Sequence, residues 1–181
     1  DVCGAFPDAQ FLHYNTPHSK RVLLTEDYQR IEDVVPNLVA TKFESASPTE
    51  TRKLVTQTSL QHFLGEGNFP WGCLHGECSL LAFTAPLSPA RARRFFDLGV
   101  TGQVAELFRC ADEIDSVVEA LYGPVADLPL VDGAYDKILA RASGFEMPLR
   151  MLSPYEGCDI ATYEACVASL RDAHPDWLER G

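Results

Sequence analysis

Two side chains that can take part in chemistry, Tyr14 and Lys42, each end a short apolar run of this sequence. Lys42 follows the run at 38–41, which starts behind the breaker pair Pro36-Asn37 and is typical of a buried strand. Apolar surroundings favour the neutral form of an amine, and a neutral amine is a nucleophile towards carbonyl carbons. The alternative is a lysine that extends from the strand end into water. Both interpretations place Lys42 at the C-terminal end of a strand.

Tyr14 has the equivalent position one strand earlier. It ends the apolar segment at 10–14, which Asn15 and Pro17 close. Tyr14 and Lys42 are 28 positions apart, a separation that fits one βα unit. In parallel α/β sheets the ligand site lies at the C-terminal edge, so both side chains would point into one pocket. The alternative is a core tyrosine whose hydroxyl is satisfied by its packing neighbours.

The elements around these two positions alternate between strand and helix. Thr25 marks one helix start, with its hydroxyl as the N-cap, and Ser47 marks the next. Further strands are expected at 61–64 and 77–83, the second after a short connection. From Ser88 onward only helices are expected, at 88–98, 104–121, 134–143 and 160–173. This order predicts a parallel α/β sheet or barrel followed by helices.

Composition excludes several classes of function. The 181 residues carry a net charge of -11, which provides no electrostatic footprint for nucleic acid or an anionic membrane. No apolar run approaches the roughly 20 residues that span a bilayer, and the N-terminus lacks the basic flank and apolar core of a leader. The sequence therefore predicts a cytoplasmic protein without a nucleic-acid or membrane partner.

The cysteines are expected to be reduced thiols. The chain has six of them, none in a CxxC pair, and they are spread through apolar segments. The segment 73–78 also holds His75 and Glu77, but its spacing matches no common metal site. We therefore expect no bound metal.

The residues around Tyr14 and Lys42 resemble the C-terminal half of a known family, the dihydrodipicolinate synthases and N-acetylneuraminate lyases, which are class I pyruvate-dependent aldolases. The resemblance rests on Tyr14-Asn15-Thr16-Pro17, on Pro36-Asn37-Leu38-Val39-Ala40-Thr41-Lys42 one βα unit later, and on Gly67 and Ser79. The segment 136–154 is similar to the closing helix of that family and its arginine-containing loop. The resemblance spans essentially the whole chain.

This resemblance implies an α/β fold, the (β/α)8 TIM barrel followed by a C-terminal helical subdomain. Residues 1–98 would supply strands five to eight with the active-site edge, and residues 99–181 the helical subdomain. The first four strands, with the loop that holds the pyruvate carboxylate, are not in this sequence, and four strands alone leave unpaired edges. We therefore expect the missing N-terminal half-barrel in a longer protein or in a split barrel. The family also implies a homo-oligomer, usually a tetramer.

The resemblance further implies a mechanism without a cofactor. Lys42 would form a Schiff base with a small-molecule 2-keto acid, and Tyr14 would transfer protons. Backbone groups near Gly67 and Cys78 would line the pocket, since glycine permits close approach of a substrate. Glu44 would contact a substrate hydroxyl; the alternative is a solvated carboxylate at the strand end.

Departures from the family pattern bear on the substrate. Where dihydrodipicolinate-forming members carry an arginine five positions after the tyrosine, this chain has Ser19, and Gly67 is followed by Asn68-Phe69 in place of an acidic pair. The sequence thus favours an aldolase or dehydratase for pyruvate or another 2-keto acid over dihydrodipicolinate synthesis. Two alternatives stay open: a non-catalytic homologue that serves as a structural or regulatory partner, and an unrelated small-molecule binder.

Overall fold

The structure, a computed structural model, describes residues 1–17, 19–44 and 47–178. The chain forms two compact units, one of residues 1–83 and 95–111 and the other of residues 84–94 and 112–181. The boundary predicted at residue 98 stays a prediction.

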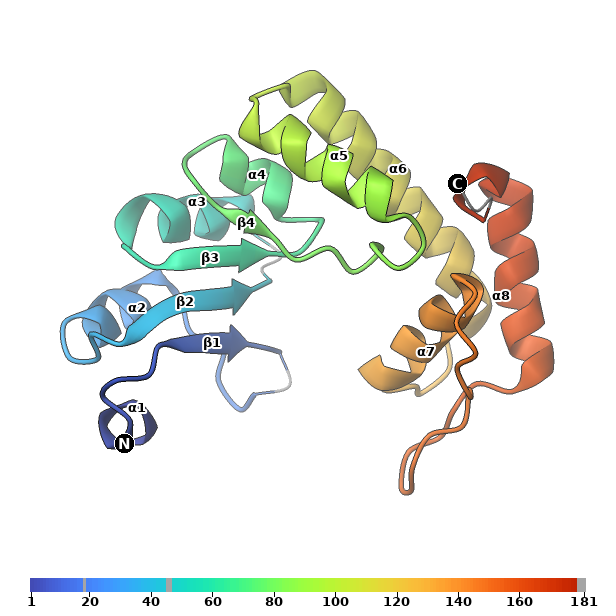
Figure 1. Ribbon diagram of the computed structural model, residues 1–181, viewed down its shortest axis with the longest axis horizontal. Coiled ribbons are helices and arrows are strands. Elements are labelled where there is room, and N and C mark those ends of the chain that lie inside the picture. Colours follow the sequence, from blue (N-terminus) through green and yellow to red (C-terminus); the bar gives the residue numbers. More distant parts are fainter. Residues whose placement is uncertain (18, 45–46, 179–181) are drawn as a thin grey trace. The chain divides into compact units, whose positions relative to one another are not determined.

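A four-stranded parallel sheet is the framework of the first unit (Figure 1). The strands follow one another in chain order: β1 (Phe11–Asn15), β2 (Leu38–Phe43), β3 (Gln61–Leu64) and β4 (Ser79–Leu80). The first three match the predicted strands closely. The fourth is much shorter than the predicted strand at 77–83, with two residues that pair with Phe63 and Leu64.

Four helices and part of two more complete the first unit. They are α1 (Val2–Ala5), α2 (Thr25–Glu32), α3 (Pro48–Gln57) and α4 (Phe69–Cys73), with the C-terminal half of α5 (Pro89–Val100) and the start of α6 (Val104–Tyr122). Helix α4 lies where the sequence indicated only a connection. It has five residues with a proline in its first turn, too few for a helical hydrophobic period to be visible.

One face of the sheet is covered by helices, and the other is more exposed to solvent. In β1, the side chains of Leu12 and Tyr14 are 49% and 47% exposed, whereas Asn15 on the opposite face is 1% exposed. The core lies on this second face, where Tyr28 of α2 and Leu54 of α3 are fully buried. We call the first face, which carries Leu12 and Tyr14, the open face, and the second the helix-covered face.

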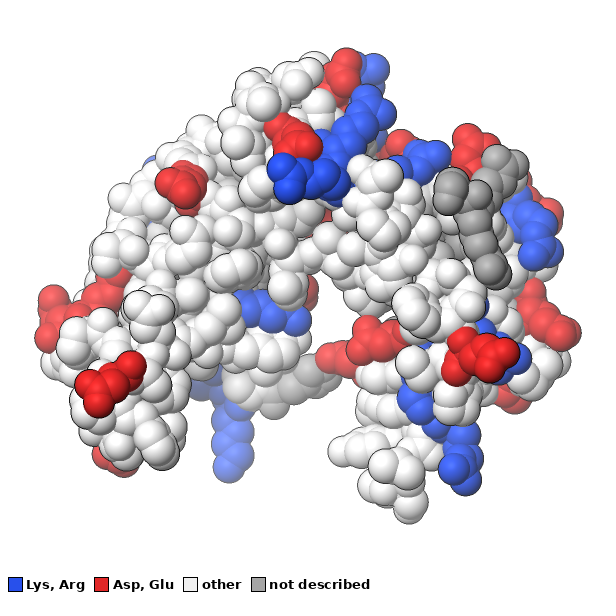
Figure 2. Space-filling model, in the orientation of Figure 1, with Lys and Arg blue, Asp and Glu red and all other residues white. Residues whose placement is uncertain are grey.

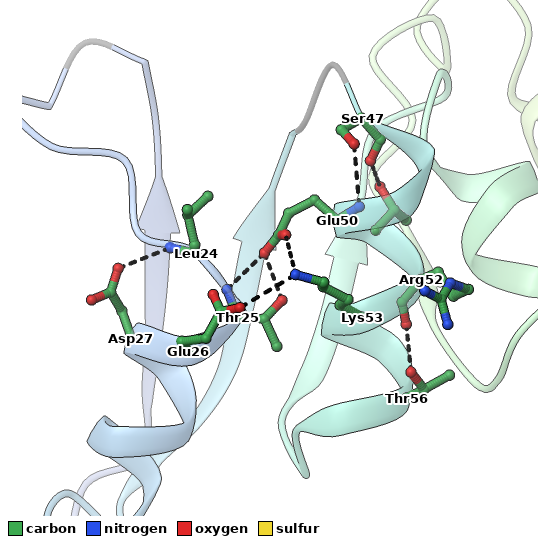
Figure 3. Close-up of polar contacts among 10 residues, drawn as sticks. Leu24, Thr25, Glu26, Asp27, Ser47, Glu50, Arg52, Lys53 and Thr56 are labelled. Carbon is green, nitrogen blue, oxygen red and sulfur yellow. Dashed lines mark hydrogen bonds and ion pairs between the residues drawn. The ribbon is translucent and has the colours of Figure 1, made fainter.

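A carboxylate from α3 fixes the start of α2 (Figure 3). The Thr25 backbone N–H and hydroxyl both donate to Glu50 Oε1, at 2.7 and 2.6 Å. The N-cap is therefore Leu24, and the expected Thr25 hydroxyl cap is wrong: that hydroxyl donates to Glu50 and does not accept from its own helix. By contrast, Ser47 caps α3 as predicted, since its Oγ accepts from the Glu50 N–H at 3.3 Å.

The second unit is helical. It contains the end of α6, the short 3-10 helices η1 (Gly123–Val125) and η2 (Pro175–Trp177), α7 (Asp132–Ala142) and α8 (Ile160–Ala173). Its core includes Val117, Leu121 and Ile138, each fully buried. Trp177 donates its indole N–H to Glu113, and Arg91 contacts the same carboxylate at 2.5 Å. The helix at 160–173 has the predicted bounds, and the other helices differ from prediction by a few residues.

The surface of the molecule carries both signs of charge (Figure 2). On the face shown, the atoms over the sheet are mostly uncharged, and basic side chains gather over α5 and α6. Within the described part of the chain, no helix is long and apolar enough to cross a bilayer.

Candidate active site

One row of side chains crosses the open face near the C-terminal ends of the strands. Strand pairing places Tyr14 opposite Lys42, Lys42 opposite Phe63, and Phe63 opposite Ser79. Register partners in parallel strands project from the same face of the sheet, so these four side chains are neighbours in order. The predicted placement of Tyr14 and Lys42 at one sheet edge is thus what the strand register shows.

Tyr14 and Lys42 are in direct contact. The Lys42 Nζ atom lies 3.8 Å from the centroid of the Tyr14 ring, a cation–π geometry. Lys42 is half-buried and Tyr14 is half-exposed, so the amine is neither sealed in the core nor free in solvent. The contact gives the long Lys42 side chain a defined direction, along the face that carries Tyr14.

A buried hydrogen-bond chain on the helix-covered face supports the strand that carries Lys42. Thr41 precedes Lys42, and its hydroxyl lies 2.8 Å from Nδ1 of His62, which is 1% exposed. The Thr58 hydroxyl lies 2.8 Å from His62 Nε2 and donates to the Leu54 carbonyl at 2.9 Å. Since the one hydroxyl hydrogen of Thr58 is used on Leu54, Nε2 must carry the imidazole proton and Nδ1 must accept from Thr41.

This arrangement keeps His62 neutral. Burial lowers the pKa of His62 from 6.5 to about 4, because the charged imidazolium would lose its hydration. The neutral ring crosslinks β2 and β3 through Thr41, directly behind Lys42. Sequence reasoning missed this network, because the local pattern around His62 shows only an alternation of polar and apolar residues.

Asn15 positions the loop that follows Tyr14. Its side chain makes a reciprocal pair of bonds with one residue: Nδ2 donates to the Leu23 carbonyl at 2.8 Å, and Oδ1 accepts from the Leu23 N–H at 3.0 Å. The pair closes the segment from β1 to α2. The sequence indicates Asn15 as a residue that closes the strand and as part of the Tyr14-Asn15-Thr16-Pro17 motif, but nothing local indicates its partner Leu23.

The predicted substrate-binding residues after β2 and β3 lie in different surroundings. Glu44 is exposed at the end of β2, and its carboxylate lies beside Gly65, where an added Cβ would meet Glu44 Oε1 at 3.0 Å. Gly67 is exposed, and an added Cβ there would meet no atom within 4 Å. A Cβ at position 65 would only require the flexible Glu44 side chain to shift, and a pocket role for Gly67 and Glu44 stays a prediction.

The Cys78 thiol lies away from the Tyr14–Lys42 pair. Cys78 is buried, and its Sγ lies 2.9 Å from the place of an added Cβ on Gly72 of α4. Its neighbour Ser79 belongs to the row on the open face, and Ser79 Oγ accepts from Gln61 Nε2 at 3.1 Å. Sequence reasoning missed Gln61 as the partner of Ser79. The prediction that backbone groups near Cys78 line the pocket stays untested.

The loop after Tyr14 has its own polar contacts and one ion pair with α2. The Ser19 hydroxyl lies 2.7 Å from the carbonyl oxygens of both Thr16 and Arg21, which share its one hydrogen. Arg21 forms an ion pair with Asp27 in the first turn of α2. Across residues 1–17, 19–44 and 47–178, no group of three or more His, Cys, Asp or Glu side chains could hold a metal ion.

No protein-family model matches this sequence, and no curated protein matches it. Solved structures do match. The chain superposes on sialic acid aldolase from Ruminococcus gnavus with a TM-score of 0.71 and 17% identity, over 97% of this chain and 59% of that one. Dihydrodipicolinate synthase from Bacteroides thetaiotaomicron matches with a TM-score of 0.74 and 15% identity, over 90% of this chain and 56% of that one.

A third structure, a prophage protein of the dihydrodipicolinic acid synthase family from E. coli K12 in complex with pyruvate, has a TM-score of 0.74 and 15% identity, over 91% and 56% of the two chains. The present chain thus spans a little over half the length of these proteins. Four parallel strands followed by helices confirm the predicted fold class. The chain has the fold of the C-terminal half of a (β/α)8 barrel of the dihydrodipicolinate synthase and N-acetylneuraminate lyase type, with its helical subdomain.

Proposed function

We propose that this chain carries the reactive lysine of a class I lyase, an aldolase or dehydratase, that acts on pyruvate or another 2-keto acid. One observation carries the proposal: Lys42 Nζ lies 3.8 Å from the Tyr14 ring centroid, on the open face of a parallel sheet. The similar structures add support, since one is an aldolase and another holds pyruvate.

The chemistry follows from an amine beside a phenol. The neutral Lys42 amine attacks the keto carbon, water leaves, and a C=N bond replaces the C=O bond. The resulting iminium draws electrons from the neighbouring carbon, so that a C–C or C–O bond to the adjacent atoms can break. The Tyr14 hydroxyl, on the ring that contacts Lys42, exchanges protons with these intermediates. The sequence positions that differ from dihydrodipicolinate-forming members, such as Ser19, favour a different 2-keto acid reaction.

Borohydride trapping tests this proposal. The folded protein is incubated with pyruvate, reduced with borohydride and digested, and the adduct is located by mass spectrometry. We expect a lactyl-sized addition on Lys42, which is lost in Lys42→Arg. The other lysines provide internal controls, above all Lys53, which is ion-paired with Glu26 on the surface. If the folded protein, assembled with its N-terminal half-barrel, gives no adduct on Lys42 or labels Lys53 equally, the lyase proposal is overturned and a non-catalytic partner is favoured.

A further inference from the structure

Two cysteines outside the row of Tyr14 and Lys42 face each other across a short loop. Cys73 is the last residue of α4 and Cys78 directly precedes β4, and their sulfur atoms lie 3.8 Å apart in a hydrogen bond. Cys73 is half-buried, whereas Cys78 is buried. One sulfur is thus within reach of a small reagent, and the second lies directly behind it.

Two glycines, which have no side chains, provide the space that the two sulfur atoms occupy. An added Cβ on Gly72 would come within 2.9 Å of the Cys78 sulfur, and one on Gly99 within 2.7 Å of the Cys73 sulfur. Any larger residue at either position would collide with a sulfur atom. A disulfide has a bond of about 2.05 Å, so the two atoms need to approach by less than 2 Å, roughly the length of one bond.

We propose that Cys73 and Cys78 form a peroxide-sensitive dithiol that closes to a disulfide and ties the end of α4 to the start of β4. The inference does not depend on the lyase function. In the first step the Cys73 thiolate attacks hydrogen peroxide, the O–O bond breaks, hydroxide leaves, and Cys73 becomes a sulfenic acid. In the second step the Cys78 sulfur attacks the Cys73 sulfur, the S–O bond breaks, and water leaves with the Cys78 proton.

The proton distribution in the pair supports these roles. The hydrogen bond from Cys78 lowers the pKa of Cys73, because it stabilises the thiolate, and the thiolate is the nucleophile. The same bond and the burial of Cys78 raise the pKa of Cys78, so this sulfur keeps its proton until Cys73 has been oxidised. The pair therefore divides into an attacking sulfur and a resolving sulfur.

The sequence supplies a matched control. Cleavage after lysine and arginine places Cys73 and Cys78 in one peptide, 54–91, and Cys158 and Cys166 in another, 151–171. Burial raises the pKa of Cys158, and it raises that of Cys166 to about 11. Both of these thiols are expected to stay reduced under conditions that oxidise Cys73.

The test exposes the folded protein to hydrogen peroxide, blocks the remaining thiols with an alkylating agent, and analyses both peptides by mass spectrometry. We expect peptide 54–91 to lose two hydrogen masses and to take up no alkyl group, roughly tenfold faster or more than Cys158 and Cys166 in peptide 151–171 lose their thiols. Dithiothreitol should restore two alkylation sites. Equal rates in the two peptides, or a sulfinic acid on Cys73 without a disulfide, would overturn the proposal.

Two variants separate the two steps. In Cys78→Ser, Cys73 should accumulate as a sulfenic acid that dimedone captures, because the resolving sulfur is gone. In Cys73→Ser, Cys78 should react no faster than Cys166. Circular dichroism shows whether each variant is folded, and the unmodified protein supplies the decisive measurement if one is not. Capture of a sulfenic acid on Cys78 in the folded Cys73→Ser variant would contradict the assigned roles.

Discussion

At the scale of single residues, Tyr14 combines two properties that can be separated by substitution. Its ring contacts the Lys42 side chain, and its hydroxyl is the proton-exchanging group of the proposed mechanism. Phenylalanine keeps the ring and removes the hydroxyl, whereas alanine removes both. The comparison therefore distinguishes positioning of the amine from proton transfer.

We expect Tyr14→Phe to slow formation of the Lys42 adduct by about 10²-fold or more, the usual range for loss of a general acid–base group. The free energy of unfolding should change little, because Tyr14 is 47% exposed. Tyr14→Ala should slow the reaction at least as much. Adduct formation is measured by quenching with borohydride at a series of times. A Tyr14→Phe protein that reacts at the normal rate would limit Tyr14 to positioning.

His62 makes stability depend on pH. Its pKa is 6.5 in an unfolded chain and about 4 in the fold, so between these values the unfolded state binds more protons. Stability is thus fully present above about pH 6.5 and is lost as the pH falls towards 4. From pH 7 to pH 5 the loss from this group is about 2 kcal/mol.

Urea unfolding at the two pH values checks this expectation. Other groups also titrate in the range, so the informative quantity is the difference between the unmodified protein and His62→Gln. The variant should be less stable at pH 7, because it loses the exact fit of the ring between Thr41 and Thr58, but its stability should vary less with pH. Identical pH slopes for the two proteins would show that His62 is not held neutral.

At the scale of elements, helices α2 and α3 are joined by Glu50. The Glu50 side chain is 13% exposed, and it accepts two hydrogen bonds from Thr25, including one from the first N–H of α2. The first N–H groups of a helix have no acceptor within that helix. Here one of them donates to a side chain of the next helix along the chain. Helices α2 and α3 are therefore held together by a polar contact in addition to their apolar packing.

Glu50→Ala is expected to destabilise the fold by about 1–3 kcal/mol, since it leaves the Thr25 donors without their acceptor. Glu50→Gln should cost less, because its amide oxygen can still accept. The control is Glu26→Gln, which removes an exposed ion pair with Lys53 and should leave stability nearly unchanged. Denaturant unfolding of the three variants gives the comparison, and an equal cost for Glu50→Ala and Glu26→Gln would contradict a stabilising role for this polar contact.

At the scale of the whole molecule, the sheet has an open face and a helix-covered face, and two leucines report on them. Leu64 is fully buried, and Leu12 is 49% exposed on the open face. We expect Leu64→Ala to cost about 2–5 kcal/mol and Leu12→Ala within about 0.5 kcal/mol of zero. Chemical unfolding of this chain measures both. A cost for Leu12→Ala that approaches that of Leu64→Ala would mean that a further layer covers the open face.

Sequence patterns predicted those parts of the fold that depend on residues close together in the sequence. The strand at 61–64 and the helix at 160–173 are confirmed with their bounds, because a turn with Gly65 follows the first and Pro175 lies just beyond the second. The extent of β4 and the helix α4 were not predicted, since both are too short to show a period. The prediction that the Thr25 hydroxyl caps α2 was wrong for another reason: the hydroxyl donates to Glu50, which lies 25 positions away in the sequence.

The same division applies to the candidate site. The separation of Tyr14 and Lys42 matched one βα unit, so their placement on adjacent strands could be predicted. The bonds of Asn15 with Leu23 and of His62 with Thr41 depend on tertiary structure. No local rule indicates that a polar residue in a strand will find its partner on a neighbouring element.

The register of β1 against β2 also bears on the order in which contacts form as the chain folds. Tyr14 and Lys42 become neighbours only when two parallel strands pair across the intervening helix α2. Parallel pairing requires closure of a long loop, which is slower than local helix formation. A chain that is still folding therefore carries Lys42 as an ordinary solvated lysine. The contact of Lys42 with the Tyr14 phenol therefore belongs to the finished sheet and not to either strand alone.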